Sequence, residues 1–377
     1  MTAPGVSPYS LPDTLRWPAR YLWPSMRRRS RFTARPAIHR RSGTSDPLSG
    51  RTVRLVFFGD LMCMPGDRVP EVSPDLRALI EAADFVIGNC EAPVTDEPPH
   101  PSARYAFTFR MAATYLQQFL ERLGAAPDRC ALSVANNHAG DQGAAGLEQT
   151  LECLARLGVI SVGARTGTGP ATVLDVAGLR IAVSAWTAWM NREVFSPGSG
   201  PWRQGDLDEL LQASEGAAPV GAGSADFRIG LPHWDHEFCH YPCAATRERA
   251  LRCVDRGFDL LVGHHPHVLQ PIEWMGKGFC AYSLGNLNGP PLLLRSVPAR
   301  LLGVLEVELG AAASSGTTAT SAPGVALRAY RLHSFVQLRQ GSGASLIPVA
   351  DAEPRLRHRL ERRLGRLFPD LREGASG

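Results

Sequence analysis

Three histidines lie within four residues at the end of a largely apolar run. His264, His265 and His267 follow residues 258–262, which have the length and content of a buried strand. The end of such a strand is expected to place the histidines on a loop at the carboxyl edge of a sheet. Imidazoles this close repel one another when protonated, but they can share a cation. The stretch therefore predicts a metal site.

Other apolar runs also end in side chains that bind metals or transfer protons. Together with the histidine cluster, seven such residues fall at predicted strand-to-loop junctions: Asp60, Glu91, Asn137, His138, His233, His265 and His267. Taken singly, each has an ordinary explanation, since Asp60 could cap a helix, Asn137 could make a turn and His233 could be a core residue. Taken together, they match the carboxylate, amide and imidazole ligands that hold two divalent ions. His264 is an alternative to His265, because either leaves a plausible spacing to His267.

The elements that must position these residues alternate along the chain, which predicts an α/β fold. Strands are expected at 53–58, 84–88, 130–134, 159–162, 227–231, 258–262, 278–283, 301–309 and 325–332, with a hairpin formed by 172–176 and 179–185. Helices are expected at 74–83, about 112–123, 143–157 and 244–256. Residues 190–225 have a poorer pattern, with one short helix near 206–213, and we interpret them as a variable excursion.

Composition narrows the class of protein. The chain has 377 residues, 44% of them hydrophobic, which is enough to build a sizeable core. Its net charge is only +4, with much of the basic excess near the two ends, so nucleic acid is not an expected partner. No apolar window of about 18 residues exists, and the N-terminus lacks the apolar core of a signal peptide. We expect a cytoplasmic protein with at most peripheral membrane contact.

Three regions are expected. Residues 1–50, rich in Pro, Ser and Arg, predict a disordered basic leader; Trp17, Tyr21 and Trp23 could instead help it to anchor on an anionic membrane or polymer. Residues 51–350 form the predicted domain. In the tail, 351–377, leucines at helical spacing predict a docked amphipathic helix, with partner or membrane-surface binding as the alternative.

The eight cysteines are scattered, and most lie in apolar segments where a reduced thiol behaves as a small hydrophobic group. A disulfide framework is therefore not expected. Cys239 and Cys243 form a tempting pair, but no second pair follows at zinc-finger spacing. The sequence does not favour a structural zinc site at this pair.

The motifs resemble those of the bacterial capsule-synthesis proteins of the poly-γ-glutamate type (CapA/PgsA-like). The resemblance covers about residues 53–309 and is carried in order by these segments: 58–62, 88–91, 135–139 with Asp141 and Gly143, 233–234 with Glu237, 263–268 and 282–286. It departs from the usual phosphoesterase pattern in two places. Met62 stands where Asp-x-His would supply an imidazole, and Asp235 stands where Gly is expected.

The resemblance implies a calcineurin-like metallophosphoesterase fold, a four-layer α-β-β-α sandwich of two mixed sheets with the site at the strand ends. It also implies that the ligands of two divalent ions (Mn, Fe or Zn) are Asp60, Glu91, Asn137, His233, His265 and His267. His138, preceded by Asn137, takes the place of a general acid near the leaving group.

These inferences predict a metal-dependent hydrolase of the phosphoesterase type, in which a metal-activated hydroxide attacks phosphorus. The expected substrate is a phosphoester or an anionic polymer. The alternative is an accessory protein of poly-γ-glutamate or other capsule polymer synthesis and export, which keeps the fold but works by binding.

Overall fold

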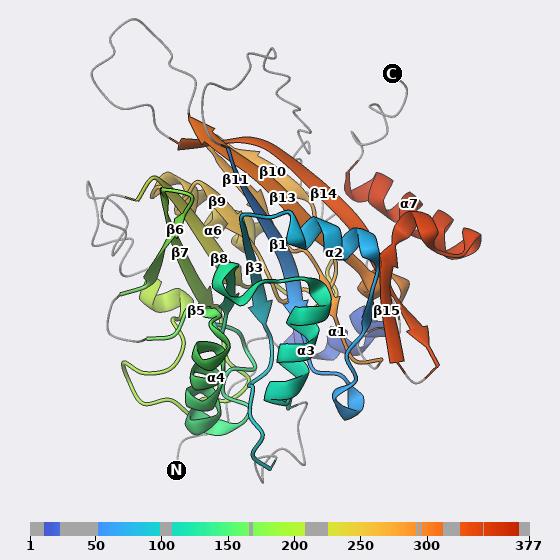
Figure 1. Ribbon diagram of the computed structural model, residues 1–377, viewed down its shortest axis with the longest axis horizontal. Helices are drawn as coiled ribbons and strands as arrows, with labels where there is room; N and C mark the ends of the chain where they lie inside the picture. Colours follow the sequence, from blue (N-terminus) through green and yellow to red (C-terminus); the bar gives the residue numbers. More distant parts are fainter. Residues whose placement is uncertain are drawn as a thin grey trace, which may run out of the picture.

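The computed structural model describes residues 11–22, 52–98, 108–165, 169–207, 225–291, 294, 296–311, 325–341 and 343–368. Two β-sheets lie face to face, and helices cover their outer faces (Figure 1). This four-layer arrangement of two mixed sheets confirms the predicted fold class.

The first sheet runs in the order β2-β15-β14-β13-β1-β3-β4-β5, with β12 also paired to β1. Its strands are β1 (Val53–Leu61), β2 (Glu71–Val72), β3 (Phe85–Cys90), β4 (Cys130–Ser133), β5 (Ile160–Val162), β12 (Asn286–Asn288), β13 (Leu301–Ala311), β14 (Val325–Gln340) and β15 (Gly343–Pro348). Strands β1, β3, β4 and β5 are parallel, whereas β13, β14 and β15 pair antiparallel to their neighbours β1, β13 and β14. The parallel half therefore delivers its carboxyl ends to one edge.

The second sheet runs in the order β10-β11-β9-β8-β7-β6. Its strands are β6 (Ala171–Val176), β7 (Leu179–Thr187), β8 (Phe227–His233), β9 (Leu260–Val262), β10 (Ile272–Met275) and β11 (Gly278–Ala281). The β6–β7 hairpin agrees with the sequence prediction, and β7, β8, β9 and β11 are parallel in register.

The described helices are α1 (Leu11–Leu22), α2 (Pro74–Glu81), α3 (Ala113–Leu123), α4 (Gly143–Leu157), α6 (Ala244–Asp255) and α7 (Pro354–Leu367). Short 3₁₀ turns lie at η1 (Pro65–Asp67), η3 (Pro127–Arg129), η4 (Val297–Arg300) and η5 (Val349–Asp351). No helix in this described part of the chain combines the length and apolar character needed to cross a bilayer. The helix expected near 206–213 falls mostly on residues outside the described ranges.

Successive side chains of β1 point to opposite faces of the first sheet and so belong to two different cores. Leu55 and Phe57 belong to the core between the sheets, together with Ile229 of β8. Val56 and Phe58 face the opposite way and pack in the core that includes Leu116 of α3. Helix α6 covers the outer face of the second sheet through a third core. These buried faces hold the two carboxyl edges in fixed positions.

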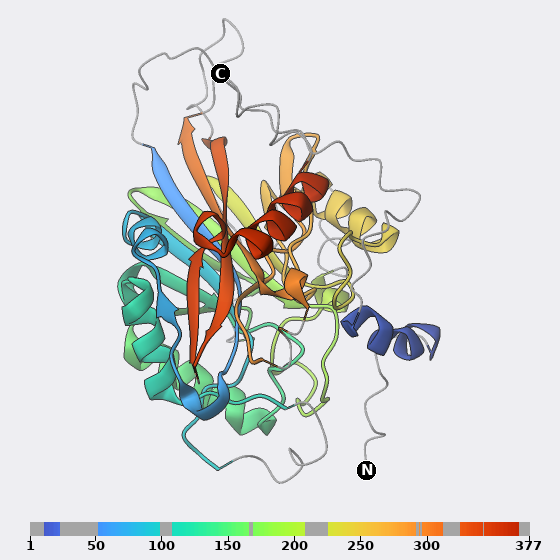
Figure 2. The same ribbon diagram turned by 90° about the vertical axis from the view of Figure 1, so that its right-hand side faces the viewer.

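The C-terminal helix α7 docks on the body, as the leucine spacing predicts. Leu360 and Leu367 are fully buried in the core between the sheets, and Leu356 and Leu364 pack against it. Figure 2 shows α7 lying against the sheets, with α1 at the side of the molecule.

Helix α1 lies inside the segment predicted to be a disordered leader, so that prediction is wrong for residues 11–22. Trp17 and Tyr21 are one helical turn apart, which places both rings on one face. They stack with centroids 5.3 Å apart and meet Phe238 edge-on at 5.9 and 5.4 Å. This aromatic contact gives the helix a packed face, and the rest of the leader lies outside the described residues.

Candidate metal centre

The carboxyl ends of parallel strands from both sheets meet at the candidate site. Strands β1 and β3 are paired so that Asp60 lies opposite Asn89, which brings Asp60 and Glu91 to the same edge. His233 is the last residue of β8, and His265 and His267 follow β9. The two sheets thus supply the site from opposite sides.

Two glycines allow the close backbone approach that this requires. A Cβ at Gly59 would lie 1.9 Å from the carbonyl oxygen of Gly285, and a Cβ at Gly263 would lie 2.0 Å from that of Tyr282. Any larger residue would push apart the strand ends that carry Asp60 and the histidine cluster.

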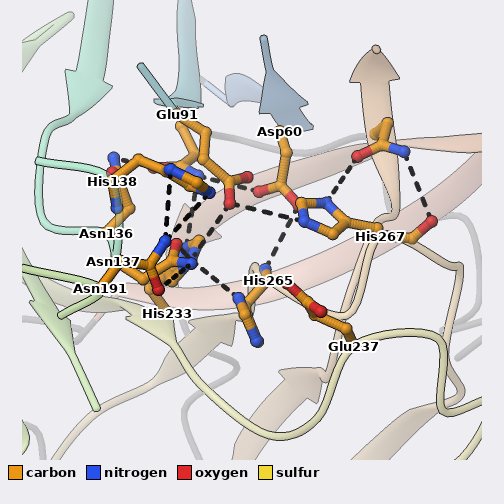
Figure 3. Close-up of polar contacts among 12 residues, drawn as sticks. Asp60, Glu91, Asn136, Asn137, His138, Asn191, His233, Glu237, His265 and His267 are labelled. Carbon is orange, nitrogen blue, oxygen red and sulfur yellow. Dashed lines mark hydrogen bonds and ion pairs between the residues drawn. The ribbon is translucent and has the colours of Figure 1, made fainter. Parts of the chain in front are cut away.

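All seven residues singled out by sequence come together, and all are buried (Figure 3). His233 Nε2 lies 2.8 Å from Asn137 Oδ1 and 3.2 Å from His265 Nδ1. His267 Nδ1 lies 3.3 Å from Asp60 Oδ2. The side chains are therefore close enough to share bound ions.

The cluster contains two groups of donor atoms that share one carboxylate. One group is Glu91, His265 and His267, and the other is Asp60, Glu91 and His233; within each, the donor atoms lie within 4.8 Å of one another. Two adjacent groups joined by a carboxylate could hold a pair of divalent ions.

The surroundings of the Glu91 carboxylate indicate whether a cation fits between the two donor groups. Both of its carboxylate oxygens are buried and make no hydrogen bond to any described residue, although Oε1 lies 3.4 Å from His233 Nε2 and 3.7 Å from His267 Nε2. Burial and the neighbouring charge of Asp60 raise the pKa of Glu91 well above its usual range. Divalent ions would compensate this carboxylate, so the residues fit the implied metals.

Two of the three ligand imidazoles are held neutral, whereas in spite of burial Asp60 raises the pKa of His267. Burial, with the neighbouring histidines, lowers the pKa values of His233 and His265 well below their usual range. Burial alone would raise the pKa of Asp60, but its hydrogen bond to His267 and the charges of nearby histidines lower it below its usual range. Neutral imidazoles and an ionised carboxylate are the forms that bind metal.

The geometry favours His265 over His264 as the metal-facing residue. His264 Nε2 lies 3.4 Å from the carbonyl oxygen of Phe58, whereas His265 belongs to a donor group with Glu91. His265 and His267 both have positive φ, 97° and 54°. Non-glycine residues rarely adopt this conformation, and it is concentrated at functional sites.

His138 lies beside the cluster with a partner of its own. Its Nδ1 is 2.6 Å from Asp141 Oδ2, and Asp141 is fully buried. The ring of Phe109 lies 4.3 Å from the imidazole, centroid to centroid. A carboxylate at Nδ1 orients the ring and leaves Nε2 for proton transfer.

Sequence reasoning missed several amides that support the site. Asn89 donates to Asp60 Oδ1 at 2.9 Å, and Asn286 Oδ1 lies 2.8 Å from His267 Nδ1. Asn136 donates to the carbonyl oxygen of Cys90 at 2.8 Å. All three stand beside predicted residues or within the quoted motifs, so their position at strand ends was the available signal.

Asn191 has no such signal, because it lies in the segment interpreted as a variable excursion. Its Oδ1 accepts from Asn137 at 3.3 Å, and its Nδ2 lies 3.4 Å from both ring nitrogens of His138. Nearby, Trp189 meets the ring of His265 edge-on at 4.5 Å. Trp189 and the beginning of the excursion therefore form one wall of the centre, a position that the poor sequence pattern did not indicate.

The fold and the cluster define an α/β sandwich with a candidate two-metal centre at the strand ends. The chain belongs to the family described as bacterial capsule synthesis protein PGA_cap, whose model matches residues 54–289. This match confirms the resemblance that the motifs carry.

Two relatives share this region. The capsule biosynthesis protein CapA of Bacillus anthracis is 30% identical over 226 residues, which are 57% of this chain and 52% of the relative. The PGA biosynthesis protein CapA of Bacillus subtilis is 30% identical over 245 residues, 61% of each chain. The match thus spans less than two thirds of either relative.

Two solved structures have a similar fold. A putative 5'-nucleotidase from Staphylococcus aureus is 14% identical with a TM-score of 0.44, over 83% of this chain and 58% of the other. The calcineurin-like phosphoesterase YfkN from Bacillus subtilis is 10% identical with a TM-score of 0.39, over 86% of this chain and 99% of the other.

Proposed function

We propose that the protein is a metal-dependent hydrolase of the phosphoesterase type. The observation that carries the proposal is the pair of donor groups that share the buried carboxylate of Glu91, whose oxygens make no hydrogen bond to a described residue. A protein that only bound a polymer would have no need for this costly arrangement, because burying carboxylates without hydrogen bonds destabilises the fold.

Six residues would hold two divalent ions (Mn, Fe or Zn): Asp60, Glu91, Asn137, His233, His265 and His267. Bound there, the ions would supply Lewis acidity to a phosphoryl oxygen and lower the pKa of attacking water. The two sheets hold the ligands in place before any ion arrives, since every one of them is buried among packed strand ends.

His138 is the proposed general acid. Asp141 holds Nδ1 at 2.6 Å, so Nε2 is the nitrogen that gives a proton to the leaving oxygen of the ester. Phe109 covers the ring, and Asn191 lies across it within 3.4 Å of both nitrogens. These neighbours fix the orientation of the imidazole beside the metal ligands.

The substrate class that we propose is a phosphoester or an anionic polymer. Two divalent cations would outweigh the charges of the two carboxylate ligands, Asp60 and Glu91, so the loaded site would favour groups that carry negative charge. Membership of the capsule synthesis family, and the PGA biosynthesis named for the Bacillus subtilis relative, support the polymer as a candidate.

The family and the names of the relatives favour a second candidate, an accessory role in capsule polymer synthesis or export. In that role the protein would bind the polymer and His138 would contribute nothing to turnover. The two candidates differ in what loss of the proposed acid does.

Metal analysis of the purified chain, followed by assays with phosphomonoesters, phosphodiesters and γ-glutamyl peptides in added manganese, tests the proposal. We expect stoichiometric metal and turnover of at least one ester. His138→Gln should keep the metal and reduce turnover about 10²- to 10⁴-fold, because it cannot donate an acidic proton.

His333→Gln is the matched control, since His333 of β14 pairs with Glu306 of β13 and not with the metal ligands. It should change neither metal content nor turnover. If metal-loaded wild type cleaves none of these substrates while a polyanion binds equally to wild type and His138→Gln, the accessory role replaces the hydrolase.

A further inference from the structure

A second group of metal-binding side chains lies on the loop between β8 and α6. One donor atom each from Asp235, His236 and Cys243 lies within 4.8 Å of the others. A tetrahedral ion with ligand bonds of about 2.0 to 2.3 Å requires donor atoms at separations of this size. None of the three belongs to the candidate metal centre described above.

Asp235 organises the group. Its Oδ1 lies 3.1 Å from His236 Nδ1, and its Oδ2 accepts from the backbone nitrogen of Cys243 at 3.2 Å. Asp235 has φ of 67°, a left-handed conformation that is unusual for a residue other than glycine. The loop is therefore folded back so that residues eight positions apart share one point.

Gln270 supplies an independent observation. Its Nε2 lies 3.3 Å from Asp235 Oδ2 and donates to the carbonyl oxygen of Cys239 at 2.9 Å, which fixes the orientation of the amide. Its Oε1 is buried and has no hydrogen-bond partner among the described residues. The amide nitrogen of Gln270 therefore holds Asp235 in place from a buried position, as a residue outside the donor group that orients a ligand.

We propose that Asp235, His236 and Cys243 form a separate site for one Zn²⁺, with water as the fourth ligand. The ion takes the place of the proton between His236 Nδ1 and Asp235 Oδ1, and this proton is released to solvent. The Cys243 thiol releases its proton to solvent, and the resulting thiolate binds the metal.

The donor set distinguishes this site from the first. Thiolate is a soft ligand that favours zinc, whereas the main centre offers only carboxylate, amide and imidazole. His236 and Cys243 are partly exposed, so the ion has a path from solvent. Zinc bound here would hold the loop that contains Glu237 and Phe238 against the beginning of α6.

Cobalt substitution tests the site with a readout that the main centre cannot produce. The full chain is stripped with a chelator, and one equivalent of Co²⁺ per site is added. We expect a thiolate-to-cobalt charge-transfer band in wild type and in His267→Ala, which disables the main centre. The band should disappear in Cys243→Ser and persist in Cys63→Ser, the matched change at the other partly exposed cysteine.

Alkylation keeps the test decisive if Cys243→Ser does not fold. In wild type, one equivalent of Zn²⁺ beyond the capacity of the main centre should slow modification of Cys243 at least about 10-fold, and that of Cys63 not at all. Equal rates for Cys243 with and without zinc, or a cobalt band that survives Cys243→Ser, would overturn the proposal. The group would then be a polar cap of α6 without metal.

Discussion

The two sheets contribute different chemistry to the centre. The first sheet supplies the oxygen donors Asp60, Glu91 and Asn137 at the ends of β1, β3 and β4, together with His138. The second supplies three imidazoles, His233, His265 and His267, at the ends of β8 and β9. Neither sheet alone carries the complete set of ligands, so the centre is assembled only when the two sheets pack together.

Removing one ligand from each sheet should produce the largest effects. Asp60→Ala and His267→Ala should each lose at least one ion per chain by elemental analysis, and each should lower any hydrolytic turnover by more than about 100-fold. Loss of metal in only one of them would show that a single sheet holds the ions, and the comparison between sheets would fail.

Glu91→Gln should affect the metal-free and metal-loaded proteins in opposite directions. The amide removes the cost of burying a carboxyl group beside the charge of Asp60, so the metal-free variant should unfold at higher urea, with a gain of about 1 to 3 kcal/mol. The same variant should bind metal more weakly. A metal-free variant less stable than metal-free wild type would mean that the contacts of Glu91 with His233 and His267 outweigh this cost.

Asn191→Ala tests the wall contributed by the loop after β7. Loss of its contacts with Asn137 and His138 should reduce turnover about 10-fold while metal content stays unchanged. Asn136→Ala, on the first sheet, is the companion change, because its amide bonds to the backbone beside Glu91. Unchanged turnover in Asn191→Ala would place that loop outside the chemistry.

Trp17→Ala lies outside both sheets and should have the smallest effect. It removes an aromatic contact worth about 1 kcal/mol, so the midpoint of thermal unfolding should move by only a few degrees. A cooperative loss of structure would show that α1 is part of the core rather than an attached element.

The site could be predicted largely because it depends on strand ends. Asp60, Glu91 and His233 each follow or end a long apolar run, and parallel strands must bring such ends together. The register that places Asp60 opposite Asn89 is fixed by the buried faces of β1, which the alternation of apolar residues already indicates.

What could not be predicted depends on contacts between segments distant in sequence. Helix α1 owes its packed face to Phe238, more than 200 residues away, so twelve residues rich in Pro and Arg gave no local sign of it. Strand β12 pairs with β1 through only three residues, too few to show a periodic pattern. Asn191 reaches the centre from a loop, where no periodicity operates.

The position of α1 has a practical consequence. Trp17 donates a hydrogen bond to Glu237, next to Phe238 at the rim of the centre, and the helix is about 18 Å long. Whatever is joined ahead of Leu11, whether an affinity tag, a fluorophore or a tether to a surface, begins within one short helix of that rim. A fluorophore on α1 itself would therefore report on changes at Glu237 and Phe238.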